Sequence, residues 1–268
     1  MPFLDSSKHI WRVWRANAKA SLTREMEFRG NFILGIIRQL LWFIIFIIFI
    51  ETLFTNTQAI SGWSKIDMLI IVALSRLVEG AMGVLFINNW MNFTQAVNKG
   101  QFDYYLLKPV PVQFYTGFKI LNIENIGNVF AGLGLLIYAL IHVSNRPSAW
   151  MVLLAFMIIP IGIVIYHSLL VIVATLVFRL ERLGALWGFN ELFSEPLTVP
   201  FDVFPDSLRA ALTYLLPIAF VVFVPAQALT GRLTWWQVPI GILIAVIFLL
   251  LANVAWRAGL KRYSSASS

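Results

Sequence analysis

The chain alternates between long apolar runs and short polar segments. An α-helix of roughly 20 apolar residues crosses the ~30 Å hydrocarbon core of a bilayer, so each long run is a possible span. The runs cover residues 31–54, 66–87, 118–141, 149–178, 184–201, 208–229 and 235–256. Several of them have neither charge nor two-residue alternation, which favours spanning helices over the strands of a membrane barrel. The pattern therefore predicts an all-α polytopic membrane protein.

Composition agrees with this class. Apolar residues make up 59% of the 268 positions, charged residues 12%, and the mean hydropathy is +0.80. The head, residues 1–30, and the tail, residues 257–268, are too short to form a soluble core, so one transmembrane domain over residues 1–268 is expected. The absence of cysteine excludes disulfides, thiolate nucleophiles and cysteine-ligated metals.

Positive charge sets the expected orientation. Cytoplasmic segments of membrane proteins are enriched in Lys and Arg, and both ends of this chain are basic. The residues concerned are Lys8, Arg12, Arg15, Lys19, Arg24 and Arg29 in the head, and Arg257, Lys261 and Arg262 in the tail. Both ends are therefore expected in the cytoplasm, which an odd number of crossings does not allow. The net charge of +7 is distributed by topology rather than in one patch, so no nucleic-acid partner is expected.

The run over residues 208–229 is the best candidate for one that does not cross. Pro217 lies in its middle and Pro225 follows, and a proline inside a helix costs roughly 3 kcal/mol or more. We expect residues 204–229 to form an outer re-entrant helical hairpin that turns at Leu216 and Pro217. Six transmembrane helices remain, with this hairpin before the sixth.

The head has the pattern of an amphipathic helix. Lys8, Arg12, Arg15 and Lys19 follow helical spacing and form one basic stripe, while apolar residues face the other way. Such a helix lies in the headgroup plane of an anionic leaflet. It is either an anchor that only fixes orientation or a surface that also contacts a partner.

Residues 89–115 are polar, aromatic and rich in turn-forming residues, and they follow the second span. Residues 90–99 can form a few helical turns, Gly100 can end them, and Pro109 and Pro111 fix the direction of exit. The aromatic side chains here favour either a contact with a soluble protein or an interfacial belt at the lipid headgroups. The aromatic residues concerned are Phe102, Tyr104 and Tyr105.

Charged and polar side chains inside the spans are costly and need partners or water. Arg76 and Glu79 stand three residues apart on the second span and can pair with each other. The other candidates are Glu124 with Asn128 on the third span, and Glu191, Glu195 and Thr198 on the fifth. They indicate either a translocation path with gating ion pairs or polar contacts that hold helices together.

Motifs for enzyme chemistry are missing from the sequence. There is no G-x-x-x-x-G-K-[ST] motif, so ATP hydrolysis is not expected in this chain, and neither H-E-x-x-H nor G-x-S-x-G occurs. His142 and His167 have no other plausible metal ligands nearby in the pattern, and no cofactor or metal is expected. A secondary transporter, or an intramembrane enzyme that uses Glu191 or Glu195, stays open as an alternative.

Three segments together resemble a known family. Residues 100–111, GQFDYYLLKPVP, resemble a G-x-(F/L)-D-x-x-L-L-(K/R)-P-(V/I) signature. The hairpin residues FP at 204–205, LPIAFV at 216–221 and PA at 225–226, and the end WRAGLKRYS at 256–264, are similar to those of the same family. This family is the permease subunit of bacterial ATP-binding-cassette exporters of the second type, in the branch with separate permease and ATPase chains. The likeness covers nearly the whole chain.

The resemblance implies an ATP-driven exporter of the bacterial cytoplasmic (inner) membrane that works by alternating access. Two copies of a separate ATPase subunit would bind ATP and magnesium, and a second permease chain, paralogous or identical, would complete the path. Residues 89–115 would be the cytoplasmic coupling loop. The residues implied in coupling are Lys99, Gly100, Phe102, Asp103, Tyr104, Leu107, Lys108 and Pro109. A path walled by apolar side chains with a few carboxylates favours an amphipathic or lipid-like substrate.

Overall fold

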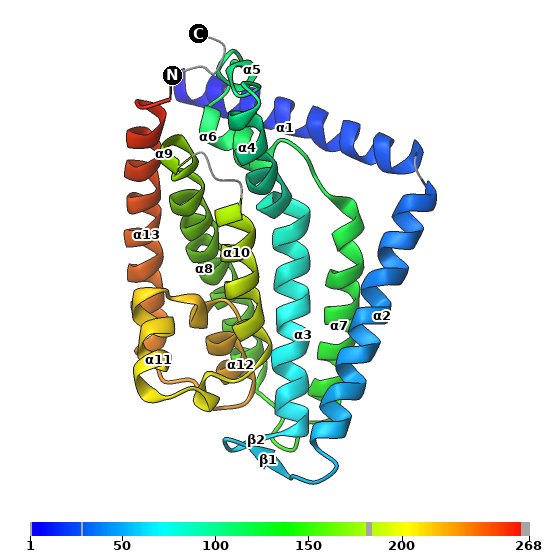
Figure 1. The fold of residues 1–268 in the computed structure, drawn as a ribbon. Helices are drawn as coiled ribbons and strands as arrows, with labels where there is room; N and C mark the ends of the chain where they lie inside the picture. The colour runs from blue at the N-terminus through cyan, green and yellow to red at the C-terminus, as the bar shows by residue number, and fades with distance from the viewer. Residues whose placement is uncertain (1, 28, 181–183, 264–268) are drawn as a thin grey trace.

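The computed structural model describes residues 2–27, 29–180 and 184–263, and these form a bundle of helices. The long helices are α1 (Pro2–Glu27), α2 (Arg29–Leu53), α3 (Lys65–Met82), α7 (Ile126–His142), α8 (Ala149–Ala174) and α13 (Gln237–Leu260). Helix α1 lies across one end of the bundle, and both termini lie at this end (Figure 1). A two-stranded antiparallel ribbon, β1 (Ala59–Ile60) and β2 (Trp63–Ser64), lies at the opposite end. We call these the α1 end and the β end.

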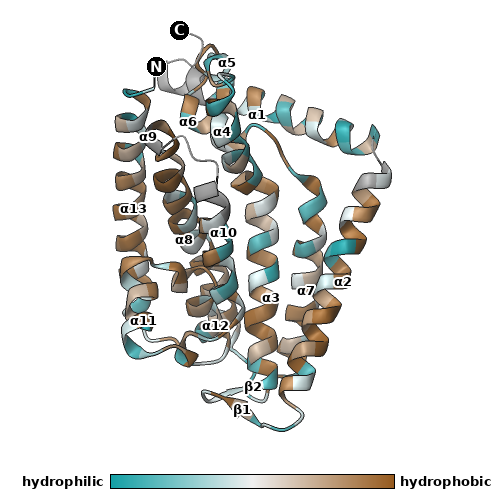
Figure 2. Ribbon diagram, in the orientation of Figure 1, coloured by the Kyte–Doolittle hydropathy of each residue, from teal (hydrophilic) through white to brown (hydrophobic). Residues whose placement is uncertain are grey.

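Within the residues that the structure describes, five helical segments are long and apolar enough to cross a membrane. They are Phe32–Leu53, Lys65–Asn98, Ile123–His142, Ala149–Ala174 and Gln237–Leu260. Apolar residues run along most of α2, α8 and α13, whereas α1 alternates between polar and apolar residues (Figure 2). Within the bundle α3 packs on α7, and α8 packs on α13. These segments establish the all-α polytopic class predicted from the sequence.

The expected fifth span differs from the prediction. Instead of one helix over residues 184–201, the chain forms α10 (Gly184–Ser194) and two 3-10 turns, η3 (Glu195–Thr198) and η4 (Phe201–Val203). Pro196 and Pro200 explain the difference, because a proline donates no backbone hydrogen bond and disfavours helix in the residue before it. Six crossings stay a prediction. Residues 181–183, which include the basic residue Arg182, lie outside the described residues.

The second span continues without a break into the polar segment. Helix α3 passes through a π-helical turn, η1 (Gly83–Ile87), into α4 (Asn88–Asn98), so residues 65–98 form one bent helix. The hydropathy pattern predicted that the span ends at residue 87 and that a separate helical segment follows. Insertions of this π type bend a helix without ending it. No loop separates α4 from α3.

Beyond α4 the chain folds back over the α1 end. The elements there are α5 (Asp103–Leu106), α6 (Val112–Phe118) and the 3-10 turn η2 (Ile123–Asn125), which leads into α7. The short helix α9 (Val177–Leu180) follows α8. Helix α1 is tied to this region by buried Ser21, whose Oγ accepts a hydrogen bond from the Leu121 backbone N–H at 3.1 Å.

The segment over residues 204–229 is broken where the sequence predicted. Its elements are α11 (Asp206–Ala210), the π turn η5 (Ala211–Leu215), the 3-10 turn η6 (Ile218–Phe220) and α12 (Phe223–Leu229), with a turn at Leu216 and Pro217. Its second half is buried against α8. Gly162 of α8 makes this packing possible, because a Cβ there would overlap the backbone of Phe220 and Val221.

Candidate functional site: an exposed turn and two polar clusters

The polar segment ends α4 with a tight turn. Gly100 has a φ of +68°, a conformation that favours glycine, and the Gln101 backbone N–H donates back to the carbonyl of Ala96 at 2.8 Å. The chain then forms the one-turn helix α5 and enters α6. We call residues 99–109 the α5 turn. It lies at the α1 end of the bundle, beside both termini (Figure 1).

A cluster of buried aromatic rings supports the α5 turn. The ring of Phe102 lies 5.2 Å from that of Phe93 on α4, 5.8 Å from Phe178 on α9 and 5.1 Å from Tyr263, which follows α13. Trp256 of α13 contacts the same cluster at 6.3 Å from Phe102. The α5 turn is thereby joined to the ends of three helices that are far apart in the sequence.

The position of Phe102 corrects one expectation. The aromatic pattern predicted that this ring contacts a partner or the lipid headgroups, but its exposed fraction is 0%. The reason is tertiary, since α9 and the end of α13 close over the α5 turn from the side. Phe102 therefore supports the turn from within, and a partner has no access to it in this conformation.

Other coupling candidates lie on the exposed side of the α5 turn, which we call the crest. Tyr104 is 69% exposed and Leu107 is 79% exposed, and Lys99, Lys108 and Pro109 are exposed beside them. Asp103 is half-buried at the start of α5. Large exposed apolar side chains on a rigid support are typical of protein contact sites.

Tyr105 points inward and fixes α5 against α6. Its ring meets that of Tyr115 at 5.5 Å, and its hydroxyl accepts a hydrogen bond from Lys119 Nζ at 3.3 Å. The Lys119 ammonium lies 4.6 Å from the centre of the same ring, a favourable cation–π distance. The sequence analysis did not anticipate Lys119 as a partner.

His167 joins α8 to the base of the same region. The indole Nε1 of Trp90 donates a hydrogen bond to His167 Nε2 at 3.3 Å, and the rings of Phe86 and Phe118 pack on the imidazole. Within the described ranges, no group of His, Asp or Glu side chains could hold a metal ion. The sequence analysis treated His167 as an isolated polar residue, and its contacts here are those of helix packing.

A polar cluster lies further along α3. The carboxylate of Glu79 and the guanidinium of Arg76 form an ion pair at 3.2 Å, as their spacing predicts, with side chains 17% and 24% exposed. The Arg76 guanidinium also lies 5.8 Å from the ring centre of Phe46 on α2. Glu195 belongs to η3, which packs against α3. We call Arg76, Glu79 and Glu195 the central cluster.

The three polar candidates on the expected fifth span do not share one face. Glu191 and Glu195 are exposed, whereas Thr198 is buried and its hydroxyl donates to the Glu195 carbonyl at 2.8 Å. The helix ends at Ser194, and the change to 3-10 geometry turns Thr198 away from the face of Glu191.

The polar pair expected on the third span is also divided. Glu124 lies on η2 and pairs with Arg38 of α2 at 3.2 Å, with side chains 31% and 65% exposed. Asn128 faces α3 instead, where a Cβ on Gly80 would lie 2.9 Å from the Asn128 Cβ. The sequence signal for Arg38 was a lone cation in an apolar run, which calls for a partner.

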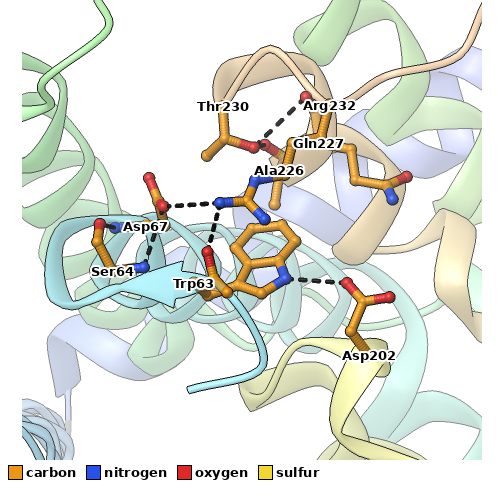
Figure 3. A network of polar contacts seen from close by, with 9 residues as sticks. Trp63, Ser64, Asp67, Asp202, Ala226, Gln227, Thr230 and Arg232 are labelled. Atoms are coloured by element: carbon orange, nitrogen blue, oxygen red, sulfur yellow. Dashed lines mark hydrogen bonds and ion pairs between the residues drawn. The ribbon is translucent and has the colours of Figure 1, made fainter. Parts of the chain in front are cut away.

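At the β end, four residues form a network that the sequence analysis missed. Arg232, which follows α12, donates to the Gly62 carbonyl at 2.8 Å and to Asp67 at 3.2 Å, and its guanidinium lies 4.4 Å from the centre of the Trp63 ring (Figure 3). The Trp63 indole N–H donates to Asp202 of η4 at 2.9 Å (Figure 3). We call Trp63, Asp67, Asp202 and Arg232 the clamp.

The clamp joins segments that are distant in the chain. Asp67 also caps α3 together with Ser64, and Asp202 accepts a second bond from Arg209 of α11 at 3.0 Å. Trp63 is fully buried and packs on Phe223 of α12. The start of α3 is thus fixed to both halves of the broken segment.

Comparison with known proteins gives one match. The family model described as ABC-2 family transporter protein matches residues 40–267. No curated protein and no solved structure matches the chain. The matched range includes the α5 turn, the central cluster and the clamp. Since the match covers most of a multi-pass helical bundle, the chain belongs to the ABC-2 family of transporter proteins.

Proposed function

We propose that this chain is the permease subunit of an ATP-driven exporter and that a separate ATPase subunit docks on the α5 turn. Membership of the ABC-2 family makes the chain a membrane transport component rather than an enzyme. The observation that carries the proposal is that Tyr104 and Leu107 of the crest are exposed, whereas the neighbouring Phe102 is fully buried. The crest offers a soluble partner apolar surface that is held in place by the ring packing around Phe102.

The basic residues give the proposed orientation. The stripe on α1, the α5 turn and the basic tail all lie at the α1 end, so this end is placed in the cytoplasm. The β end, with the clamp and the broken segment, is then placed outside. ATP and magnesium would bind in the partner, which has the chemistry that this sequence lacks.

Force would reach the membrane through the bent helix of residues 65–98. A partner that closes on ATP displaces the α5 turn, and α4 passes the displacement to α3 because no loop separates them. Helix α3 carries Arg76 and Glu79, so the same movement acts on the central cluster. Alternating access then requires the β end to open when the α1 end closes.

A second permease chain is part of the proposal. Glu191 on α10 and Glu195 on η3 are both exposed, and an uncompensated charge at mid-membrane costs ~3 kcal/mol or more. A second chain, identical or related, together with a water-filled path between the two, removes this cost. An amphipathic substrate fits such a path, which combines apolar walls with a few carboxylates.

Co-purification with the ATPase subunit tests the docking site. We expect Tyr104→Ala with Leu107→Ala to lower recovery of the ATPase on the tagged permease by on the order of tenfold, since two interface anchors are lost. The matched control is Tyr138→Ala with Leu153→Ala, a similar pair with exposed fractions of 49% and 50% on α7 and α8. Equal recovery from both double variants, with both inserted in the membrane, would refute docking at the α5 turn.

A further inference from the structure

Beneath α1 there is an apolar groove that the proposed function does not use. It has a volume of about 310 Å³ and is lined by Ile10, Trp11 and Trp14 of α1 and by Phe114 of α6. The two indole rings stack at 5.0 Å, and Trp11 is 59% exposed. An apolar groove of this size, open beside a helix that lies across the bundle, can hold part of one hydrocarbon chain.

Two cations flank Trp11 along α1. Lys8 lies three residues before it and Arg15 four residues after it, so helical spacing puts Trp11 at the margin between the basic stripe and the apolar face of the helix. Both cations are exposed, and neither has a carboxylate partner within the part of the chain that the structure describes. The sequence from residue 8 to residue 24 contains no acidic residue.

A second apolar cavity under the same helix provides a contrast. It has a volume of about 330 Å³, lies where α1 meets α2, and is lined by Leu22, Met26, Phe32, Ile33 and Ile123 together with Glu25. The carboxylate of Glu25 repels an anion, whereas the residues that line the groove at Trp11 include no carboxylate. The two cavities therefore differ in the headgroup charge that they favour.

We propose that the groove at Trp11 and Trp14 binds one anionic phospholipid. One acyl chain lies against the indole rings and Phe114, and the phosphate is held by Lys8 and Arg15. Charge complementarity selects this lipid over a zwitterionic one, because a choline group would meet the basic stripe with like charge. The site rests on the proposed placement of α1 at the cytoplasmic surface of the membrane.

Bound lipid would connect α1 to the α5 turn. Phe114 stacks on Phe118 of the same short helix at 5.4 Å, and Phe118 stacks on His167 at 5.4 Å. Helix α6 directly follows the α5 turn and is fixed to it by Tyr105 and Tyr115. An anionic lipid in the groove thus braces the element on which the ATPase is proposed to dock.

Quenching of tryptophan fluorescence by brominated lipid tests the site. The full chain in micelles is titrated with phosphatidylglycerol that has brominated acyl chains, and separately with phosphatidylcholine that has the same chains. We expect a saturable component whose midpoint for phosphatidylglycerol is at least about tenfold lower than for phosphatidylcholine, from two basic contacts. Equal midpoints would overturn the proposal, since they indicate only a non-selective lipid annulus.

Variants locate the site. Trp11→Phe with Trp14→Phe should remove the saturable component, and Trp235→Phe, at an 84% exposed indole just before α13, should retain it. Lys8→Gln with Arg15→Gln should raise the phosphatidylglycerol midpoint by on the order of tenfold and leave phosphatidylcholine unchanged. The control for lost charge is Arg257→Gln with Arg262→Gln, which should keep the original midpoint.

The outcomes separate this proposal from the docking proposal. Persistence of the saturable component in Trp11→Phe with Trp14→Phe, or an equal shift in both charge variants, would refute the lipid site. Recovery of the ATPase on the permease is measured independently, so normal recovery without selective lipid binding overturns the lipid site alone. Selective lipid binding without any effect of the Tyr104 and Leu107 variants overturns the docking site alone.

Discussion

The two ends of the bent helix formed by residues 65–98 are held by opposite chemistry. At the α1 end, rings around Phe102 fix α4 to α9 and α13, and the contacts are buried and apolar. At the β end, the clamp fixes α3 through hydrogen bonds and ion pairs in which Arg232 is 37% exposed. Buried ring packing moves as one body, whereas partly exposed ion pairs exchange readily with water. We therefore expect the contacts of Arg232 in the clamp to exchange more readily than the ring packing around Phe102, which keeps the α5 turn intact when it moves.

Cysteine labelling gives the largest expected effect, because it is all or none. The native chain has no cysteine, so single substitutions can be placed at each end. Ser207→Cys and Thr234→Cys should both react with an impermeant thiol reagent added to whole cells, and Arg262→Cys should react only after lysis. Labelling of Ser207→Cys and Thr234→Cys from opposite sides would show that the broken segment crosses the membrane. The assignment of the α1 end to the cytoplasm and of the β end to the outside would then be wrong.

Two neighbouring aromatic residues test the buried base. Phe102→Ala should lower the free energy of unfolding by about 3–5 kcal/mol, because it leaves a cavity among packed rings. Tyr104→Ala, at a 69% exposed side chain, should change it by less than about 0.5 kcal/mol. Thermal unfolding of the purified variants in one detergent measures both. Similar losses of unfolding free energy in the two variants would contradict the division of the α5 turn into a buried side at Phe102 and an exposed crest.

The clamp should give a smaller loss. Arg232→Gln removes the ion pair with Asp67 and the cation–π contact with Trp63, and we expect a loss of about 1–2 kcal/mol. The matched control is Lys65→Gln, which breaks the exposed ion pair between Lys65 and Glu51 and should cost less than about 0.5 kcal/mol. The same unfolding measurement applies. If the control costs as much as Arg232→Gln, the clamp is no stronger than an ordinary surface pair.

Local chemistry explains which features the sequence predicted. Apolar runs of spanning length predicted the long helices, Pro217 predicted the break after Leu216, and three-residue spacing predicted the pair of Arg76 and Glu79. Gly100 ends α4 for a reason that is also local, since its positive φ suits glycine. Each of these depends only on residues within a few positions in the chain.

Contacts across the chain were not predictable in this way. Arg38 and Glu124 are separated by 86 positions, Trp63 and Asp202 by 139, and Arg232 and Asp67 by 165. No periodicity in one sequence pairs such residues. The prediction for Phe102 was wrong for the same reason, because the burial of this ring depends on its packing against Tyr263 and Phe178. The end of α10 at Ser194 could have been predicted from the sequence, because Pro196 and Pro200 follow it.

The continuity of residues 65–98 makes this segment a lever. Its 34 residues extend over roughly 50 Å at 1.5 Å per residue, well beyond the ~30 Å hydrocarbon core. With the clamp as fulcrum, a tilt of about 5° displaces the α5 turn by roughly 4 Å over that length. Arg76 stands about one third of the way along the arm, so it moves by just over 1 Å on the same rise per residue. Glu79 stands three residues further along the same arm, so the ion pair of 3.2 Å between Arg76 and Glu79 moves as a unit, and its distance from Phe46 changes if α2 stays in place.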